Sequence, residues 1–171
     1  NVEGSIVQLI RAYWTWAKSY YRPQEYLTLK IALRVLKQFY GTTPVSEFGP
    51  KKLRIVRESM IRGDHEGAYP REPWSRSYIN HQCRRIRQMF KWAASHELAD
   101  ASIYQTLCTM EPLKKGRTLA REGIPIGPVS MGEVDAIRPF ISRQVEALID
   151  LQLLTGARGG ELLKIRAKDI D

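Results

Sequence analysis

The sequence holds few of the residues that build metal sites and disulfide frameworks. Its two cysteines, Cys83 and Cys108, lie far apart and belong to no CxxC pair. Its three histidines, His65, His81 and His96, lie in different segments and form no HExxH-like spacing. A CxxC metal site and a disulfide framework are therefore excluded, and we expect no metal. Two reduced thiols are typical of a cytosolic protein, so we expect a cytoplasmic location.

Long apolar segments are also missing. No run approaches the roughly 18 residues that a membrane-spanning helix needs, and no signal peptide is visible, so we expect no membrane partner. The first residue is Asn1 rather than Met, which leaves open a missing start that carried a leader. With 171 residues, 43% of them hydrophobic, the chain can form one ordinary domain or two small ones.

Acidic residues are outnumbered by basic ones. The chain has 27 Lys and Arg against 18 Asp and Glu, which gives a net charge of +9. A solvated basic surface alone could account for this charge, but the excess favours a polyanionic partner. Nucleic acid is the first candidate, and an anionic membrane surface is the second.

Apolar residues recur at three- and four-residue spacing through most of the sequence, which predicts an all-α protein. Prolines and glycines mark the expected helix boundaries, while Ser75, Ser130 and Ser142 are candidate N-caps. Glu133 stands at the capping-box position after Ser130. We find no convincing strand and no internal repeat. The predicted helices cover about residues 3–19, 24–40, 50–63, 75–96, 101–110, 130–137, 142–155 and 158–165.

The predicted helix after Ser142 is expected to bury its apolar side chains. Gly156 fits the left-handed residue that ends such a helix. A new helix can then begin near Arg158. The side chains expected to be buried are Val145, Leu148, Ile149 and Leu151–Leu154.

One segment shows no sustained period. Residues 112–130, "PLKKGRTLAREGIPIGPVS", combine recurring Gly and Pro with basic charge. This composition is typical of a linker between domains. We therefore predict a helical domain over residues 1–112, a basic linker over 113–128 and a second domain over 129–171.

The helix expected over residues 75–96 has a basic flank of one sign, since no Asp or Glu occurs from Pro73 to His96. At about 100° per residue, one apolar stripe is formed by Ile79, Cys83, Ile86, Phe90 and Ala93. A separate flank carries Arg76 at its edge together with Ser77, Asn80, Arg84, Arg87 and Lys91. Solvated faces usually mix charges of both signs, so this flank favours DNA contact over the alternative of a solvated face.

The side chains on this flank suit DNA recognition. Arg and Lys bind phosphates, and Arg can also read guanine through two hydrogen bonds. Asn80 could read adenine or hold a phosphate. The linker adds Lys114, Lys115 and Arg117 to the expected contacts. Together these groups predict a basic surface that binds double-stranded DNA.

The order of these features resembles the tyrosine recombinases, the phage-integrase family of site-specific recombinases. A basic helix reading "INHQCRRIRQMFKWAASHEL" is followed by a basic linker, then by "VSMGEVDAIRP" and "LQLLTGARGGELLKIRAKDID". The resemblance covers most of the chain. It implies a small helical, SAM-like core-binding domain and the N-terminal helices of a mostly helical (α+β) catalytic domain, with the two domains clamping the duplex.

The resemblance also implies an activity. Family members cut one strand through a Tyr nucleophile, form a 3′-phosphotyrosyl link and rejoin the strand to a partner, as a homo-tetramer on DNA and without a cofactor. "TGARGGEL" is similar to the family's first catalytic box, so Arg158 would hold the scissile phosphate and Glu161 would support it. The family's later residues, its nucleophile included, lie beyond a point equivalent to Asp171. The chain therefore looks truncated at both ends, and we expect it to bind DNA weakly and to cut nothing alone.

Two other classes of function stay open. The chain could be a stand-alone DNA-binding module or regulator in which Arg158 is a surface residue. It could also be a helical protein-interaction domain whose charge keeps it soluble. A steep fall of DNA affinity with salt would exclude the second of these, because it marks counterion release.

Overall fold

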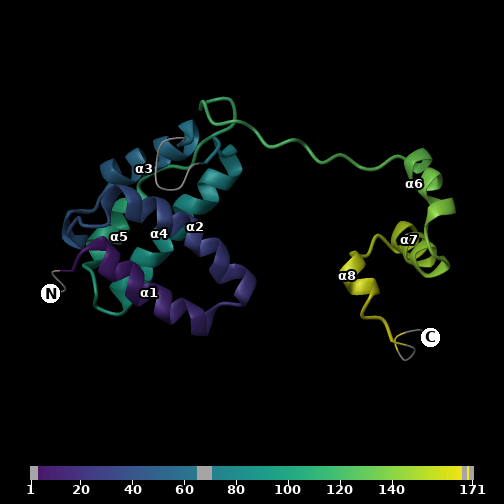
Figure 1. Cartoon of the computed structure of the whole chain (residues 1–171), viewed down its shortest axis with the longest axis horizontal. Coiled ribbons are helices and arrows are strands. Elements are labelled where there is room, and N and C mark those ends of the chain that lie inside the picture. The colour runs from purple at the N-terminus through teal and green to yellow at the C-terminus, as the bar shows by residue number, and fades with distance from the viewer. Residues whose placement is uncertain (1–3, 65–70, 167–168, 170–171) are drawn as a thin grey trace. The chain divides into compact units, whose positions relative to one another are not determined.

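The computed structural model describes residues 4–64, 71–166 and 169, and the chain divides into two compact units (Figure 1). Unit 1 spans residues 1–124 and unit 2 spans residues 125–171. Helices make up the regular structure of the described residues, where β-type pairing is confined to isolated bridges. The all-α prediction is confirmed, whereas the recombinase-specific architecture stays a prediction. Among the described residues, no helix has both the length and the apolar character to cross a membrane.

Unit 1 is a helical bundle arranged around its fourth helix. That helix, α4, contacts each of the other α-helices of the unit (Figure 1). The observed boundaries lie within three residues of the predicted ones. The elements are α1 (Ile6–Tyr20), α2 (Pro23–Tyr40), η1 (Val45–Glu47), α3 (Pro50–Arg62), α4 (Arg76–Ser95) and α5 (Ala101–Cys108).

Local chemistry explains where these helices begin and end. Pro23 and Pro50 occupy first helical positions, where the missing N–H would have no intrahelical partner. Asp100 caps α5 by accepting a hydrogen bond of 2.7 Å from the N–H of Ser102. Gly63 ends α3 with φ at +80°, and an added Cβ would lie 2.8 Å from the Arg71 carbonyl oxygen. A side chain at this position would therefore clash as well as strain the backbone.

The core of unit 1 is built on the apolar stripe of α4. All five predicted stripe residues are buried, and Phe90 stacks on Phe48 with ring centroids 4.9 Å apart. Gln82 and Met89 are also fully buried, which the stripe prediction missed because they lie at its edge. Burying each large apolar side chain contributes about 1.5–3 kcal/mol relative to exposure. The stripe therefore fixes which flank of α4 faces outward.

Asp64 and Arg71, which lie between α3 and α4, pair with each other. Asp64 and Arg71 exchange backbone hydrogen bonds of 2.9 and 2.6 Å, and their side chains pair at 3.5 Å. The Arg71 guanidinium also donates to the Ser59 hydroxyl at 2.9 Å and lies over the Trp74 ring. Burial lowers the pKa of Arg71, and the Asp64 carboxylate opposes that shift. Arg71 is thus a packed structural cation rather than a candidate phosphate ligand.

Unit 2 begins with the capping chemistry expected from its sequence. The Ser130 N–H donates to the Glu133 carboxylate at 2.9 Å, and the Ser142 hydroxyl accepts from the Val145 N–H at 3.4 Å. Gly156 has φ at +65°, the predicted left-handed residue after the long helix. The elements are α6 (Met131–Ile137), η2 (Arg138–Phe140), α7 (Arg143–Thr155) and α8 (Gly159–Leu162).

The last helix is shorter than predicted. It ends at Leu162 rather than near Ile165. The N–H groups of Lys164 and Ile165 donate three residues back, to the Glu161 and Leu162 carbonyls at 3.0 and 3.2 Å. This tighter 3₁₀-type pattern ends the α-helix. Two glycines in its first turn also lower its helix propensity.

The predicted burial along α7 is wrong. Val145, Leu151, Leu153 and Leu154 are exposed, and Leu148 and Ile149 are half-buried. Among the described residues of unit 2, Leu162 is the one buried side chain. The helical period was read correctly, but within unit 2 only short elements accompany α7, so no second layer covers its apolar face. Polar contacts hold the unit instead, with Arg138 pairing to Glu146 at 3.0 Å and to Asp150 at 2.7 Å.

Candidate nucleic-acid interface

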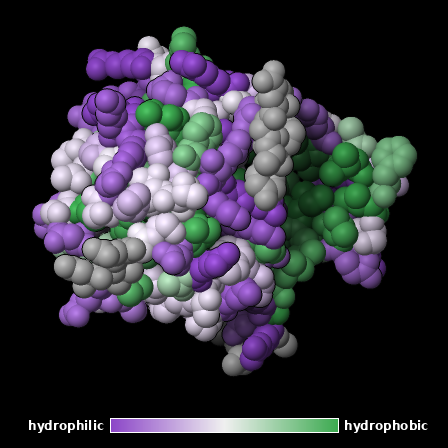
Figure 2. All heavy atoms as spheres, turned by 60° about the vertical axis from the view of Figure 1, so that its left-hand side comes forward, coloured by the Kyte–Doolittle hydropathy of each residue, from purple (hydrophilic) through white to green (hydrophobic). Residues whose placement is uncertain are grey.

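The charge excess belongs to unit 1. Of the 27 basic residues of the chain, 21 lie in residues 1–124, as do 11 of the 18 acidic residues. Unit 1 therefore carries +10, and the remaining 6 basic and 7 acidic residues give unit 2 a charge of −1. Hydrophilic side chains cover much of the unit 1 surface drawn in Figure 2. A polyanion would be attracted to unit 1 and not to unit 2.

The basic flank of α4 faces outward, as expected from the burial of the opposite stripe. Ser77, Arg84 and Lys91 are exposed, and Arg87 is half-buried, close enough for its charge to oppose the raised pKa of Tyr104 in α5. Among the described residues, no ion pair or hydrogen bond holds the side chains of Arg84, Arg87 or Lys91. Three cations on one helix face are thus available to an external anion.

Two predicted contact residues are engaged within unit 1. The Asn80 amide nitrogen donates to the Leu113 carbonyl at 3.0 Å, and its oxygen accepts from the Leu113 N–H at 2.8 Å. Arg76 donates to the Glu122 carboxylate through two nitrogens, at 2.7 and 3.1 Å, and to the Leu113 carbonyl at 3.3 Å. Sequence reasoning missed these roles because both partners lie more than thirty residues away and Leu113 contributes only its backbone.

Residues 111–122, which we call the strap, run back over unit 1. The Arg57 guanidinium donates to the Glu111 carbonyl at 2.9 Å, and the Arg76 N–H donates to the Arg121 carbonyl at 2.8 Å. Ala120 is buried. The segment predicted as a linker over 113–128 therefore divides, because its first part is docked on unit 1 and residues 123–129 are exposed.

The strap presents the predicted linker cations beside the α4 flank. It turns at Gly116, where φ is +71° and the Arg117 N–H donates to the Lys114 carbonyl at 3.1 Å. Lys114, Lys115 and Arg117 are all exposed. Lys114 follows directly on Leu113, which is bonded to Asn80 of the flank. The structure thus brings the cations of two separate segments onto adjoining surface.

Carboxylates accompany this surface at two points. Lys114 pairs with Glu111 at 2.7 Å and lowers the pKa of that carboxyl through a hydrogen bond and its charge. Arg76 likewise lowers the pKa of Glu122, mainly through its hydrogen bond. Both carboxylates are ionised at neutral pH and partly neutralise the cations next to them.

Arg158 lies in unit 2 at the start of α8. Its side chain is 90% exposed, and its guanidinium is 3.9 Å from the Glu161 carboxylate. The second Glu161 oxygen accepts the Arg158 backbone N–H at 3.0 Å, so the acid fastens the helix start. A Cβ added at Gly159 or Gly160 would meet nothing within 4 Å. Packing within the chain does not require these glycines, which leaves the backbone beside Arg158 open to approach.

Two other reactive groups among the described residues are held in their protonated forms by burial. Burial raises the pKa of the Tyr13 hydroxyl, with Tyr21 adding to the shift, and burial raises the pKa of Cys83 to about 11. Neither group is a nucleophile at neutral pH. Among the described residues, no cluster of His, Cys, Asp and Glu could hold a metal ion.

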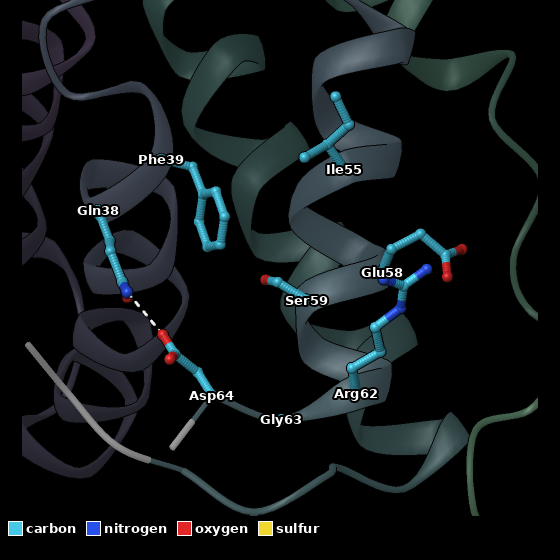
Figure 3. A pocket seen from close by; sticks show the side chains of 8 residues that line it. All are labelled: Gln38, Phe39, Ile55, Glu58, Ser59, Arg62, Gly63 and Asp64. Atoms are coloured by element: carbon cyan, nitrogen blue, oxygen red, sulfur yellow. Dashed lines mark hydrogen bonds between the residues drawn. The ribbon is translucent and has the colours of Figure 1, made fainter. Parts of the chain in front are cut away.

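A separate groove of about 570 Å³ opens between α2 and α3 (Figure 3). Phe39 and Ile55 supply its apolar wall, and Gln38 donates to Asp64 at its end at 2.6 Å. None of the predicted site residues lines this groove.

Comparison of the chain with known protein families, with curated proteins and with solved structures found no match in any of the three. The resemblance to tyrosine recombinases therefore rests on the motifs quoted above and on their order. Membership of that family stays a prediction.

Proposed function

We propose that this chain holds double-stranded DNA as part of a tyrosine-type site-specific recombinase. Unit 1 binds the duplex through the α4 flank and the strap. Arg158 in unit 2 contacts the phosphate at which the strand is cut and rejoined through a 3′-phosphotyrosyl link. The proposal includes a homo-tetramer on DNA, a cytoplasmic and nucleoid-associated protein encoded by a bacterium or a phage, and no cofactor.

The observation that carries the DNA-binding part is the exposed flank of α4. Arg84, Arg87 and Lys91 present positive charge with no acidic residue on their helix and no partner among the described residues. The adjoining strap adds Lys114, Lys115 and Arg117. Cations held along a helix face and a neighbouring turn can follow successive phosphates of a duplex. A surface that contacts only solvent usually carries charges of both signs.

The arrangement at Arg158 supports the assignment of its role. A guanidinium is permanently charged and forked, so it can grip two phosphate oxygens as charge builds in the transition state. The open glycines beside it give a phosphate room to approach. Glu161 fastens the backbone N–H of Arg158, which suits a supporting role rather than proton transfer.

A DNA-binding regulator without catalysis is the second candidate. It is favoured by the concentration of positive charge in unit 1, because such a module needs no contribution from Arg158. Both candidate functions use the same DNA-binding surface of unit 1. They differ in whether Arg158 of unit 2 takes part in catalysis.

Duplex binding tests both candidates first. The affinity for a duplex of about 25 base pairs should fall steeply with salt, since each neutralised phosphate releases counterions and contributes about −0.9 to the logarithmic slope. A protein that shows no salt-dependent binding would refute the proposed interface. The recombinase is then separated from the regulator by a covalent protein–DNA adduct on a nicked substrate, formed by the gene's full product.

A further inference from the structure

The two ends of the strap are held with unequal strength. At its first end, Leu113 exchanges two hydrogen bonds with the part-buried Asn80 amide, and Arg57 binds the Glu111 carbonyl. The preceding residue, Met110, is buried. A pair of hydrogen bonds to a partly buried side-chain amide is stable, because breaking the pair leaves polar groups without partners.

The side-chain contact at the far end is one partly exposed ion pair, between Arg76 and Glu122. The side chain of Glu122 is 40% exposed and that of Arg76 is 22% exposed. Beyond this pair, the burial of Ala120 and the bond between the Arg76 N–H and the Arg121 carbonyl hold the end. Exposed pairs contribute little to stability, and a buried alanine removes little apolar surface from water. Residues 123–129 follow without burial.

Glu122 also binds Arg76 in a geometry that a phosphate could adopt. Its two oxygens accept from two nitrogens of Arg76, which is the forked geometry that Arg uses for both carboxylate and phosphate. Arg76 stands at the edge of the flank that bears Arg84 and Lys91. A duplex on that flank would bring phosphates towards Glu122, and like charges repel.

We propose that Glu122 covers Arg76 until a DNA phosphate displaces it, which releases the far end of the strap. The inference rests on the proposed function, because it needs a duplex on the α4 flank. On release, Arg76 exchanges its ion pair with Glu122 for an ion pair with a DNA phosphate. Release also adds residues 114–122 to the exposed segment before unit 2, which lengthens its reach by up to about 30 Å.

The first experiment compares carboxylates of equal charge. Glu122→Gln and Glu47→Gln each remove one negative charge from unit 1, and Glu47 pairs with Lys52 outside the α4 flank at 3.5 Å. Glu122→Gln should tighten duplex binding about threefold to fivefold more than the control does, the amount that an exposed pair can withhold. In an Arg76→Ala background, the advantage of Glu122→Gln over the control should shrink, because only the direct repulsion between Glu122 and the DNA phosphates then remains.

Two results would overturn the inference while leaving DNA binding in place. One is equal tightening by the two substitutions in the parent chain. The other is an advantage of Glu122→Gln over the control that is undiminished without Arg76. Failure of the proposed function is distinct, because the parent chain would then show no salt-dependent duplex binding.

The second experiment follows the strap directly. Amide hydrogen exchange at the Arg76 N–H, which donates to the Arg121 carbonyl, should become faster when duplex is added to the parent chain. In Glu122→Gln, exchange should already be fast without DNA. Unchanged or slower exchange in the parent chain on DNA binding would show that the strap stays fastened and would refute release.

Discussion

Units 1 and 2 are both rich in apolar residues, yet they use them differently. In unit 1 the apolar faces of its helices meet around α4 and form one buried cluster. In unit 2 the same kind of helical pattern leaves most apolar side chains of α7 exposed, and ion pairs of Arg138 join its elements. An apolar stripe thus indicates that one face of a helix can be buried. The neighbouring elements determine whether that face is buried.

The units differ in charge as well. Unit 1 carries the entire positive excess, whereas unit 2 is nearly neutral and contributes one exposed Arg158 between a left-handed glycine and two open glycines. Under the proposed function, unit 1 would supply affinity and unit 2 would supply chemistry. The following substitutions test the charge, the packing and the local contacts of the two units.

The largest effect is expected at Arg158. In a protein that carries this sequence together with the family's nucleophile, Arg158→Ala should slow strand cleavage by about 10³–10⁵-fold, as for other positioned arginines in phosphoryl transfer. Duplex binding should change little. Arg143→Ala, at the exposed start of α7, is the matched control. A normal rate of covalent adduct formation by Arg158→Ala would refute the assigned role.

The contrast in packing predicts the next largest effect. Phe90→Ala removes a fully buried ring and should lower the free energy of unfolding by about 3–5 kcal/mol. Leu154→Ala removes a side chain that is 84% exposed and should change it by no more than about 0.5 kcal/mol. Denaturant unfolding followed by circular dichroism measures both. A large loss at Leu154 would mean that α7 is covered in solution.

The contrast in charge is tested at Arg84. Arg84→Ala should weaken duplex binding by about 1–3 kcal/mol if the side chain reads a base, and it should reduce the salt slope by about one if the side chain binds a phosphate. Arg143→Ala in unit 2 should do neither. DNA titrations at several salt concentrations distinguish base reading from phosphate binding. If Arg84→Ala and Arg143→Ala weakened duplex binding equally, the assignment of DNA affinity to unit 1 would be wrong.

A smaller effect is expected at Asn80, whose two hydrogen bonds hold the strap. Asn80→Ala should cost about 1 kcal/mol for each bond and should speed hydrogen exchange at the Leu113 N–H. Ser77→Ala, on the same flank but without such contacts, should leave Leu113 protected. Unchanged protection in Asn80→Ala would contradict the fastening role.

The smallest effect is a pH dependence at the cap of α5. The Ser102 hydroxyl and N–H lower the pKa of Asp100, so the folded state holds this carboxylate more strongly than the unfolded chain does. Its contribution is present above the unfolded pKa of about 3.9 and is lost as pH falls through the lower folded value. Asp100→Asn keeps the cap without titrating. Thermal unfolding of the two proteins should therefore diverge as the pH falls below about 4, and parallel curves would contradict the cap's role.

Much of the local structure could be predicted from the sequence. Helix boundaries followed from Pro, Gly and capping residues, because these act through neighbouring backbone groups. The exposed flank of α4 followed from its period, since burying Ile86 and Phe90 turns Arg84 outward. The positions of Lys114 and Arg117 could not be predicted, because the first end of the strap is docked through backbone groups that any sequence would offer.

The sequence by itself determined the helical class, the capped starts in unit 2 and the one-signed flank, because each depends on interactions within a few residues of the chain. Tertiary structure alone decided that Asn80 fastens Leu113, that Glu122 covers Arg76 and that α7 stays largely uncovered. Those outcomes depend on which distant segments meet, and the pairing of distant segments is governed by the packing of the whole unit rather than by any local pattern.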